Sequence, residues 1–263
     1  MIQPLRHTRP ADLGEALAAL TEGGTPYVGG TELVAAMKLG LLAPEHLVDL
    51  KGLPELRGIE LEGPLLHIGA ATPHAVAERD QLVRATLPAL STALRSIGNP
   101  RVRWQGTLGG NLCFAEPRSD LIPVLVALDA WLSLRSVRGE RTVRAGDFVT
   151  DAFVVDRRDD ELLVRISVDT DGLRYQRYTR VQHVERPTIG LAIVHRHDEW
   201  RLCLGSVGYV PHLTTAGALD ALDPVAIADA IEPIEDAAGS AEYKRHLVQV
   251  LVSRALAEAG AAA

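Results

Sequence analysis

Two glycine-rich segments are the residues of this sequence best suited to holding a bulky ligand. The first is VGGTEL, residues 28–33, and the second is GTLGGN, residues 106–111. Paired glycines allow a ligand to approach the backbone closely because no Cβ intervenes. Successive backbone N–H groups at a turn or helix start can then hold phosphate oxygens. The side chains of Thr31, Thr107 and Asn111 add neutral donors. Two such segments suggest a dinucleotide whose diphosphate lies between them.

A tight turn is the simpler interpretation of any one of these segments. A lone Gly-Gly pair is usually a turn, and two pairs beside threonine weaken that interpretation without removing it. The sequence contains neither G-x-x-x-x-G-K-[ST] nor G-x-G-x-x-G. These absences argue against a P-loop nucleotidase and a Rossmann dehydrogenase.

Composition excludes several other classes of function. The 263 residues carry 27 Lys and Arg against 34 Asp and Glu, a formal net charge of −7. Such a chain is a poor nucleic-acid binder, because phosphate neutralisation needs a basic surface. Two cysteines are too few to hold an iron–sulfur cluster. His195 and His197 lack a third ligand, so we expect no metal site. Without a signal peptide or membrane-spanning stretch, we expect a cytoplasmic protein.

The elements expected around the two segments place both at the ends of regular structure. A short strand at residues 27–28 runs into the first segment, and a helix at residues 32–38 follows it. Residues 99–119 show few regular signals, and a loop of that length inside a compact domain is usually functional. A helix is expected from Asp120 onward.

The second half of the chain changes character. Strands are expected at residues 162–168, 173–178, 189–194 and 200–204, followed by helices at residues 216–222, at residues 225–231 and from Ala241. Strands followed by helices suggest a separate α+β unit. The sequence therefore predicts an α+β protein with one domain at residues 1–172 and a second at residues 173–263.

The same segments carry a family resemblance. VGGTELVAAMKLG, followed much later by GTLGGNLCFAEPRSDLIPVLVALDA, resembles the FAD-binding medium subunit of the molybdenum hydroxylases, the family of xanthine dehydrogenase and carbon monoxide dehydrogenase. Further matches are HLVDLKGLPELRGIE, LHIGAATPHAVAE, IGNPRVRWQGT and GSAEYKRHLVQVLVSRAL. The resemblance implies a two-subdomain FAD-binding domain of the PCMH type, followed by a small α+β domain of antiparallel sheet and helices.

The resemblance also implies which residues contact FAD. They are Val28, Gly29, Gly30, Thr31, Glu32, Leu33, Ala71, Thr107, Gly109, Gly110, Asn111, Ser119, Asp120, Leu163 and Arg177. Ser119 and Asp120 match a pair on the adenosine side, whereas Ala71 and Leu163 match residues on the flavin side. Arg177 stands where the family often has a lysine at the flavin edge. Arginine keeps the charge but not the compact ammonium geometry.

The function that the resemblance implies is electron transfer through FAD. Partner chains are expected to be an iron–sulfur small subunit and a molybdenum-cofactor large subunit, in a heterotrimer that can pair into a dimer. The flavin would take electrons from the iron–sulfur clusters and pass them to a terminal acceptor. No side chain of this chain is expected to act as a catalytic acid or base.

Two alternatives remain open on sequence grounds. One is a free-standing flavoenzyme on the same fold, which would show acid–base groups beside the flavin ring. The other is a nucleotide-binding interaction module with no redox role, which would not take up FAD. An exposed apolar surface would favour the subunit of a complex, because subunit interfaces need one.

Overall fold

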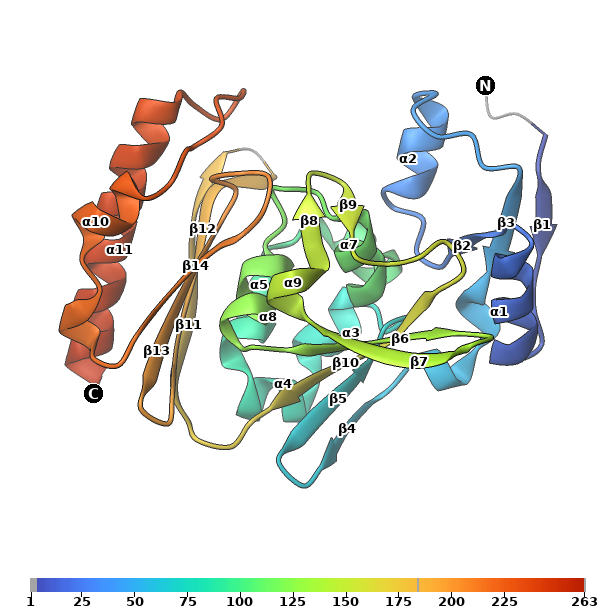
Figure 1. The fold of residues 1–263 in the computed structure, drawn as a ribbon, viewed down its shortest axis with the longest axis horizontal. Coiled ribbons are helices and arrows are strands. Elements are labelled where there is room, and N and C mark those ends of the chain that lie inside the picture. Colours follow the sequence, from blue (N-terminus) through green and yellow to red (C-terminus); the bar gives the residue numbers. More distant parts are fainter. Residues whose placement is uncertain (1–3, 184, 263) are drawn as a thin grey trace.

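The computed structural model describes residues 4–183 and 185–262. Its N-terminal elements are β1 (Arg6–Thr8), α1 (Leu13–Thr21), β2 (Thr25–Tyr27), α2 (Leu33–Lys38) and β3 (His46–Asp49). They form a small parallel sheet with helices, at the right of Figure 1, in which β3 lies between β1 and β2. The first glycine segment is the connection from β2 to α2. Two 3₁₀ turns, Leu50–Gly52 and Pro54–Leu56, lead from β3 into the next sheet.

A five-stranded antiparallel sheet forms the middle of the molecule. Its strands, in spatial order, are β4 (Ile59–Glu62), β5 (Leu65–Gly69), β10 (Leu162–Asp169), β6 (Trp131–Ser136) and β7 (Gly139–Arg144). The central strand β10 pairs with β5, although the two strands are far apart in the sequence. Helices occupy most of the sequence between β5 and β6.

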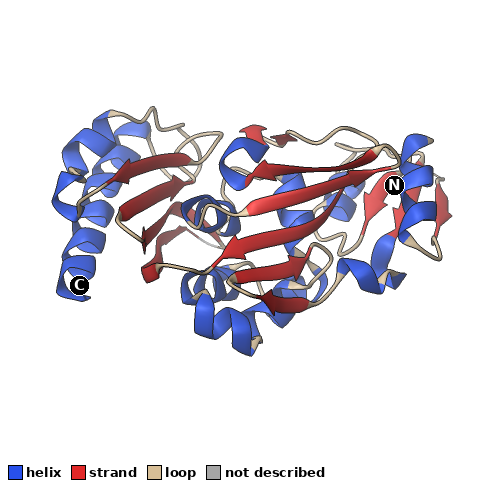
Figure 2. Cartoon of the chain, turned by 60° about the horizontal axis from the view of Figure 1, so that its bottom comes forward, coloured by secondary structure: helices blue, strands red, loops and turns tan. Residues whose placement is uncertain are grey.

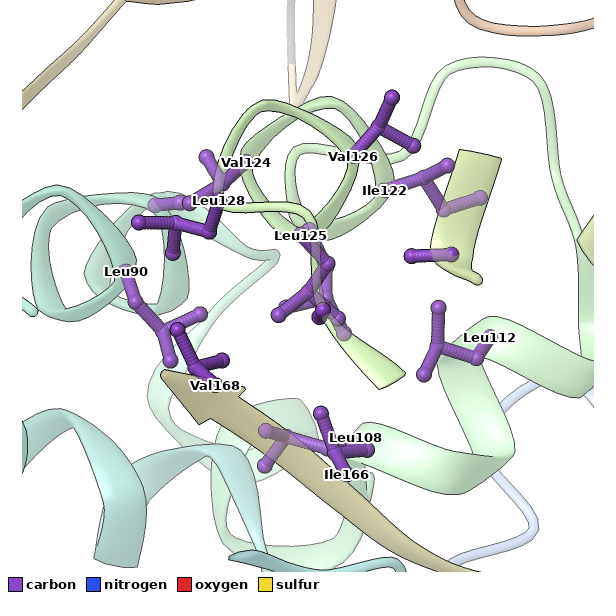
Figure 3. Packing of buried hydrophobic residues seen from close by; sticks show 14 of the residues in the cluster. Leu90, Leu108, Leu112, Ile122, Val124, Leu125, Val126, Leu128, Ile166 and Val168 are labelled. Atoms are coloured by element: carbon purple, nitrogen blue, oxygen red, sulfur yellow. The ribbon is translucent and has the colours of Figure 1, made fainter. Parts of the chain in front are cut away.

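Short helices lie between β5 and β6, and a helix and a small hairpin follow β7. They are α3 (His74–Arg79), α4 (Gln81–Thr86), α5 (Pro88–Ser96), α6 (Pro100–Gln105), α7 (Leu108–Phe114), α8 (Leu121–Ala127), α9 (Ala145–Phe148), β8 (Val149–Asp151) and β9 (Val154–Val155). Every residue of α8 is buried, so this helix is the centre of the main core. Figure 3 shows Leu125 of α8 among Leu108 and Leu112 of α7 and Ile166 of β10.

The C-terminal part is a second antiparallel sheet covered by helices, at the left of Figures 1 and 2. Its elements are β11 (Leu173–His183), β12 (Arg186–Arg196), β13 (Glu199–Gly205), β14 (His212–Ala216), a 3₁₀ turn (Leu219–Ala221), α10 (Pro224–Asp229) and α11 (Ala241–Ala262). Successive side chains of a strand point to opposite faces. Ala192 and Val194 of β12 accordingly belong to the core around α8, whereas Leu191 and Ile193 belong to the core beneath α10 and α11.

Two sequence expectations about the elements are wrong. Residues 99–119 contain α6 and α7, and each helix has a side-chain N-cap. Asn99 Oδ1 accepts the N–H groups of Arg101 and Val102, and Thr107 Oγ1 accepts the N–H of Gly110. The helix expected at residues 216–222 is instead the end of β14 and a 3₁₀ turn. Pairing with β13 holds the first of these residues extended, with Ala216 opposite Trp200.

Candidate functional site

The two glycine segments, far apart in sequence, lie directly against each other. A Cβ on Gly29 would collide with the carbonyl of Gln105 and would lie 2.9 Å from the Cα of Gly106. Real Cβ atoms do not approach backbone so closely, so only glycine fits at position 29. The first segment is thus packed on the residues that open the second.

The second segment is packed in turn on the end of β5. A Cβ on Gly109 would lie 2.7 Å from the Cβ of Ala70, and the Gly109 N–H donates to the Ala70 carbonyl at 2.8 Å. The Leu108 N–H donates to the Thr72 carbonyl at 3.1 Å. These contacts join β2, β5 and α7 into one rigid corner.

The backbone of the first segment presents donors that the protein does not use. Gly30 has a φ of 70°, which turns the chain sharply and which glycine adopts without strain. In the described part of the chain, the N–H groups of Gly30, Thr31 and Glu32 have no protein acceptor. Backbone donors left without an acceptor near a cavity are suited to an anionic group.

A cavity of about 310 Å³ opens at this corner. The expected residues that line it are Val28, Gly29, Gly30, Thr31, Glu32, Leu33, Ala71, Thr107, Gly109, Gly110, Asn111 and Leu163. Gly110 is exposed on the wall, and a Cβ there would meet only the Thr107 hydroxyl, at 2.9 Å. A side chain at position 110 would therefore reduce the room in the cavity.

Three expected residues lie outside the cavity lining. Ser119 donates through Oγ to Asn111 Oδ1 at 2.6 Å, so it orients a lining side chain. Asp120 is buried and accepts from the Tyr178 hydroxyl at 2.6 Å and from Arg180 at 3.0 Å. Burial raises the pKa of Asp120, while Tyr178 and Arg180 oppose that rise.

Arg177 is the clearest departure from the expectation. Its guanidinium forms an ion pair with Glu258 of α11, with Nε 2.8 Å from the carboxylate oxygen. Side chains along β11 alternate between the two faces of the sheet, and this pair places Arg177 on the helix-covered face. A flavin-edge contact from Arg177 therefore has no support in the geometry.

Several lining residues carry no sequence signal for a site. His74 is buried, and in the described chain its Nδ1 has no hydrogen-bond partner. Burial, with a smaller contribution from Arg103, lowers the pKa of His74 to about 4, so the imidazole is neutral. Arg157 comes from a charge run that reads as a solvated connection, yet it lines the cavity and donates to the Glu161 carbonyl at 2.8 Å. The fold brings His74 to the second segment, where its N–H donates to the Gly106 carbonyl at 3.0 Å beside the antiparallel bridge between Pro73 and Thr107.

The lining fits a ligand with an anionic part and a flat apolar part. Unused backbone donors and the hydroxyls of Thr31 and Thr107 gather where the glycine segments meet. Aliphatic side chains from other elements complete the wall: Leu50, Leu56, Leu162, Leu163 and Val102. A flavin dinucleotide has both parts, so the residues present fit FAD.

Comparison with known proteins identifies the family. A family model described as the FAD binding domain in molybdopterin dehydrogenase matches residues 3–169. The chain belongs to this family. The medium chain of carbon monoxide dehydrogenase from Afipia carboxidovorans is 34% identical and covers 97% of this chain and 96% of its own length. The corresponding chain of Hydrogenophaga pseudoflava is 32% identical, with 97% of each chain covered.

Solved structures agree with this assignment. Carbon monoxide dehydrogenase from Hydrogenophaga pseudoflava, in a form lacking the Mo-pyranopterin moiety, superposes with a TM-score of 0.91 at 31% identity, covering 100% of this chain and 99% of that one. The reconstituted enzyme from Oligotropha carboxidovorans gives 0.92 at 29% identity, covering 100% of both. The chain is an FAD-binding medium subunit of the molybdenum hydroxylase type, an oxidoreductase component of a multi-subunit complex.

Two further properties concern the described residues alone. No helix among them is long and apolar enough to cross a membrane. Within the same residues, no group of three or more His, Cys, Asp or Glu side chains is arranged to hold a metal ion.

Proposed function

We propose that the cavity holds FAD with its diphosphate at the junction of the two glycine segments. The contact of Gly29 with Gln105 and Gly106 carries this proposal, because it brings the unused donors of residues 30–32 to the wall formed by Thr107 and Gly110. Ser119 and Asp120 act indirectly in this arrangement, through Asn111 and through β11 respectively. Residues 1–172 form the proposed FAD-binding domain and residues 173–263 the proposed C-terminal domain.

The chain's own residues bind and orient the cofactor and do not move protons. His74 is a buried titratable group of the lining, and its imidazole is neutral. When bound, FAD would accept electrons from iron–sulfur clusters of a partner chain and deliver them to a terminal acceptor. The aliphatic wall at Leu162 and Leu163 would exclude water from one side of the flavin.

The proposed partners are an iron–sulfur small subunit and a molybdenum-cofactor large subunit. Apolar side chains on the surface support a partner-bound state, since interfaces need an exposed apolar patch. Leu39 is 75% exposed and Leu41 is 72% exposed, and the adjacent Leu42 also lines the cavity. A partner chain docked on these leucines would bring its iron–sulfur clusters close to the cavity. A chain that purifies with FAD but without iron, molybdenum or partner chains would favour the free-standing flavoenzyme instead.

Replacement of Gly110 by valine tests the cofactor placement. The new side chain enters the cavity and takes room that FAD needs, while its Cβ displaces the Thr107 hydroxyl that lies 2.9 Å away. We expect Gly110→Val to raise the FAD Kd at least tenfold, an effect of about 1.4 kcal/mol or more. Flavin absorbance after gel filtration and thermal unfolding of the apoprotein measure retention and folding.

Gly217→Val is the matched control, because Gly217 is exposed and its nearest neighbour, the Asp198 carbonyl, is 4.0 Å from an added Cβ. This variant should retain FAD as the wild type does. Full FAD occupancy in Gly110→Val would show that the diphosphate lies elsewhere.

A further inference from the structure

Arg186, at the start of β12, joins two carboxylates from distant parts of the chain. Its Nη2 lies 2.9 Å from Glu32 Oε1, and its Nη1 forms an ion pair with Glu116 Oε2. Glu32 belongs to the first glycine segment and lines the cavity, whereas Glu116 follows α7, which begins with the second segment. One guanidinium of the C-terminal sheet therefore joins a residue of the cavity lining to the segment that follows α7.

The charges at this point are unfavourable for an anionic ligand unless Arg186 is present. Without Arg186, the carboxylate of Glu32 would be left unpaired on the cavity wall. Burial raises the pKa of Glu116, Arg186 and Arg118 lower it, and Glu32 raises it. Arg157 is the arginine among the lining residues, and its Nη1 donates to the backbone carbonyls of Arg158 and Glu161.

We propose that Arg186 is a positioning residue for FAD, which acts by neutralising Glu32 and holding its carboxylate away from the diphosphate. Arg186 is not part of the lining, so it works through Glu32 and not by contact with the cofactor. Like charges in a partly buried site repel strongly, and salt screens them when they are reached by solvent. The inference rests on the proposed placement of the diphosphate beside residues 30–32.

The ion pair also explains why a glutamate is tolerated in a segment that faces an anion. Its carboxylate ties the turn after β2 to β12, and the cost of its negative charge is removed by the same contact. A glutamine at position 32 would keep the size of the side chain and give up the charge.

Titration of the full apoprotein with FAD, followed by flavin fluorescence at low and high salt, tests this role. We expect Arg186→Met to raise the FAD Kd about tenfold in 50 mM salt and the effect to shrink in 500 mM salt. Arg186→Lys keeps the charge but not the fork that reaches both carboxylates, so we expect a smaller loss of affinity than in Arg186→Met. The double variant Arg186→Met with Glu32→Gln should recover most of the affinity.

Arg174→Met is the control for the loss of one positive charge. Arg174 lies on β11, and its guanidinium is 3.9 Å from Asp198, which is almost fully exposed. Its FAD Kd should match that of the wild type. A wild-type Kd in Arg186→Met would overturn the inference, and so would a loss that is independent of salt and not recovered by Glu32→Gln. If Gly110→Val still loses FAD in that case, the cofactor site stands and only the role of Arg186 fails.

Discussion

Gly109 and Gly110 are neighbours in the sequence with different physical roles. Gly109 is buried against Ala70, where a Cβ has no room, whereas Gly110 is exposed on the cavity wall. A side chain at position 109 would strain the packing of α7 on β5, and one at position 110 would compete with the ligand. The sequence motif has glycine at both positions, but only the contacts in the structure show that Gly109 is needed for packing and Gly110 for room in the cavity.

His74 gives a prediction for the pH dependence of stability. Its pKa is about 4 in the folded protein, against about 6.5 when unfolded. The unfolded chain therefore binds a proton in the window between these values, and stability falls as the pH falls from about 6.5 to about 4. The loss attributable to His74 is roughly 3 kcal/mol.

Urea unfolding of wild type and His74→Leu at pH 7 and pH 4 measures this contribution. We expect the variant to lose less stability than the wild type on acidification, because leucine takes up no proton. Identical losses in the two proteins would show that His74 is protonated in the folded state over this range.

At the scale of elements, the N-terminus of α8 is fixed to β11 by a buried ionic contact. Asp120 accepts from Tyr178 and from Arg180, whose side chain is 14% exposed. Removing one partner of a buried pair leaves an uncompensated charge and typically costs about 3 kcal/mol or more. Arg180→Met should therefore lower the free energy of unfolding by roughly that amount at pH 7.

Denaturant unfolding measures the change, and the double variant Arg180→Met with Asp120→Asn provides the comparison. We expect the double variant to regain part of the stability, since the unpaired charge is gone. If Arg180→Met unfolds at the same denaturant concentration as wild type, the contact does not join the two elements energetically.

The elements around the site show what sequence patterns can and cannot reveal. The strand before the first glycine segment and the helix after it follow from local pattern, and the structure has β2 and α2 there. α6 and α7 were not expected, because three glycines and a proline between residues 100 and 110 obscure the helical signal that Asn99 and Thr107 supply as caps. Leu50, Leu56 and Leu162 reach the cavity from other parts of the fold, and nothing in their local sequence marks them.

At the scale of the whole molecule, the exposed leucines after α2 are the feature that an isolated chain would not need. Leu39 and Leu41 bury little surface here, so replacing both by glutamate leaves the fold and the cavity unchanged. In the complex, two carboxylates in an apolar interface would be strongly unfavourable. We expect Leu39→Glu with Leu41→Glu to reduce co-purification of partner chains at least tenfold while FAD is retained.

Metal analysis and chain composition of the purified complex measure this effect. Val225→Glu serves as the control, because it also replaces an exposed apolar side chain by a carboxylate, on α10. Unchanged iron and molybdenum content in the double variant would place the partner interface on another surface.

The structure of the FAD-bound chain is the measurement that tests the cofactor placement most directly. We predict that the diphosphate accepts hydrogen bonds from the backbone N–H groups of Gly30, Thr31 or Glu32 and lies beside Thr107 and Gly110. FAD bound with its diphosphate away from both glycine segments, or the two segments separated in the bound state, would contradict this placement.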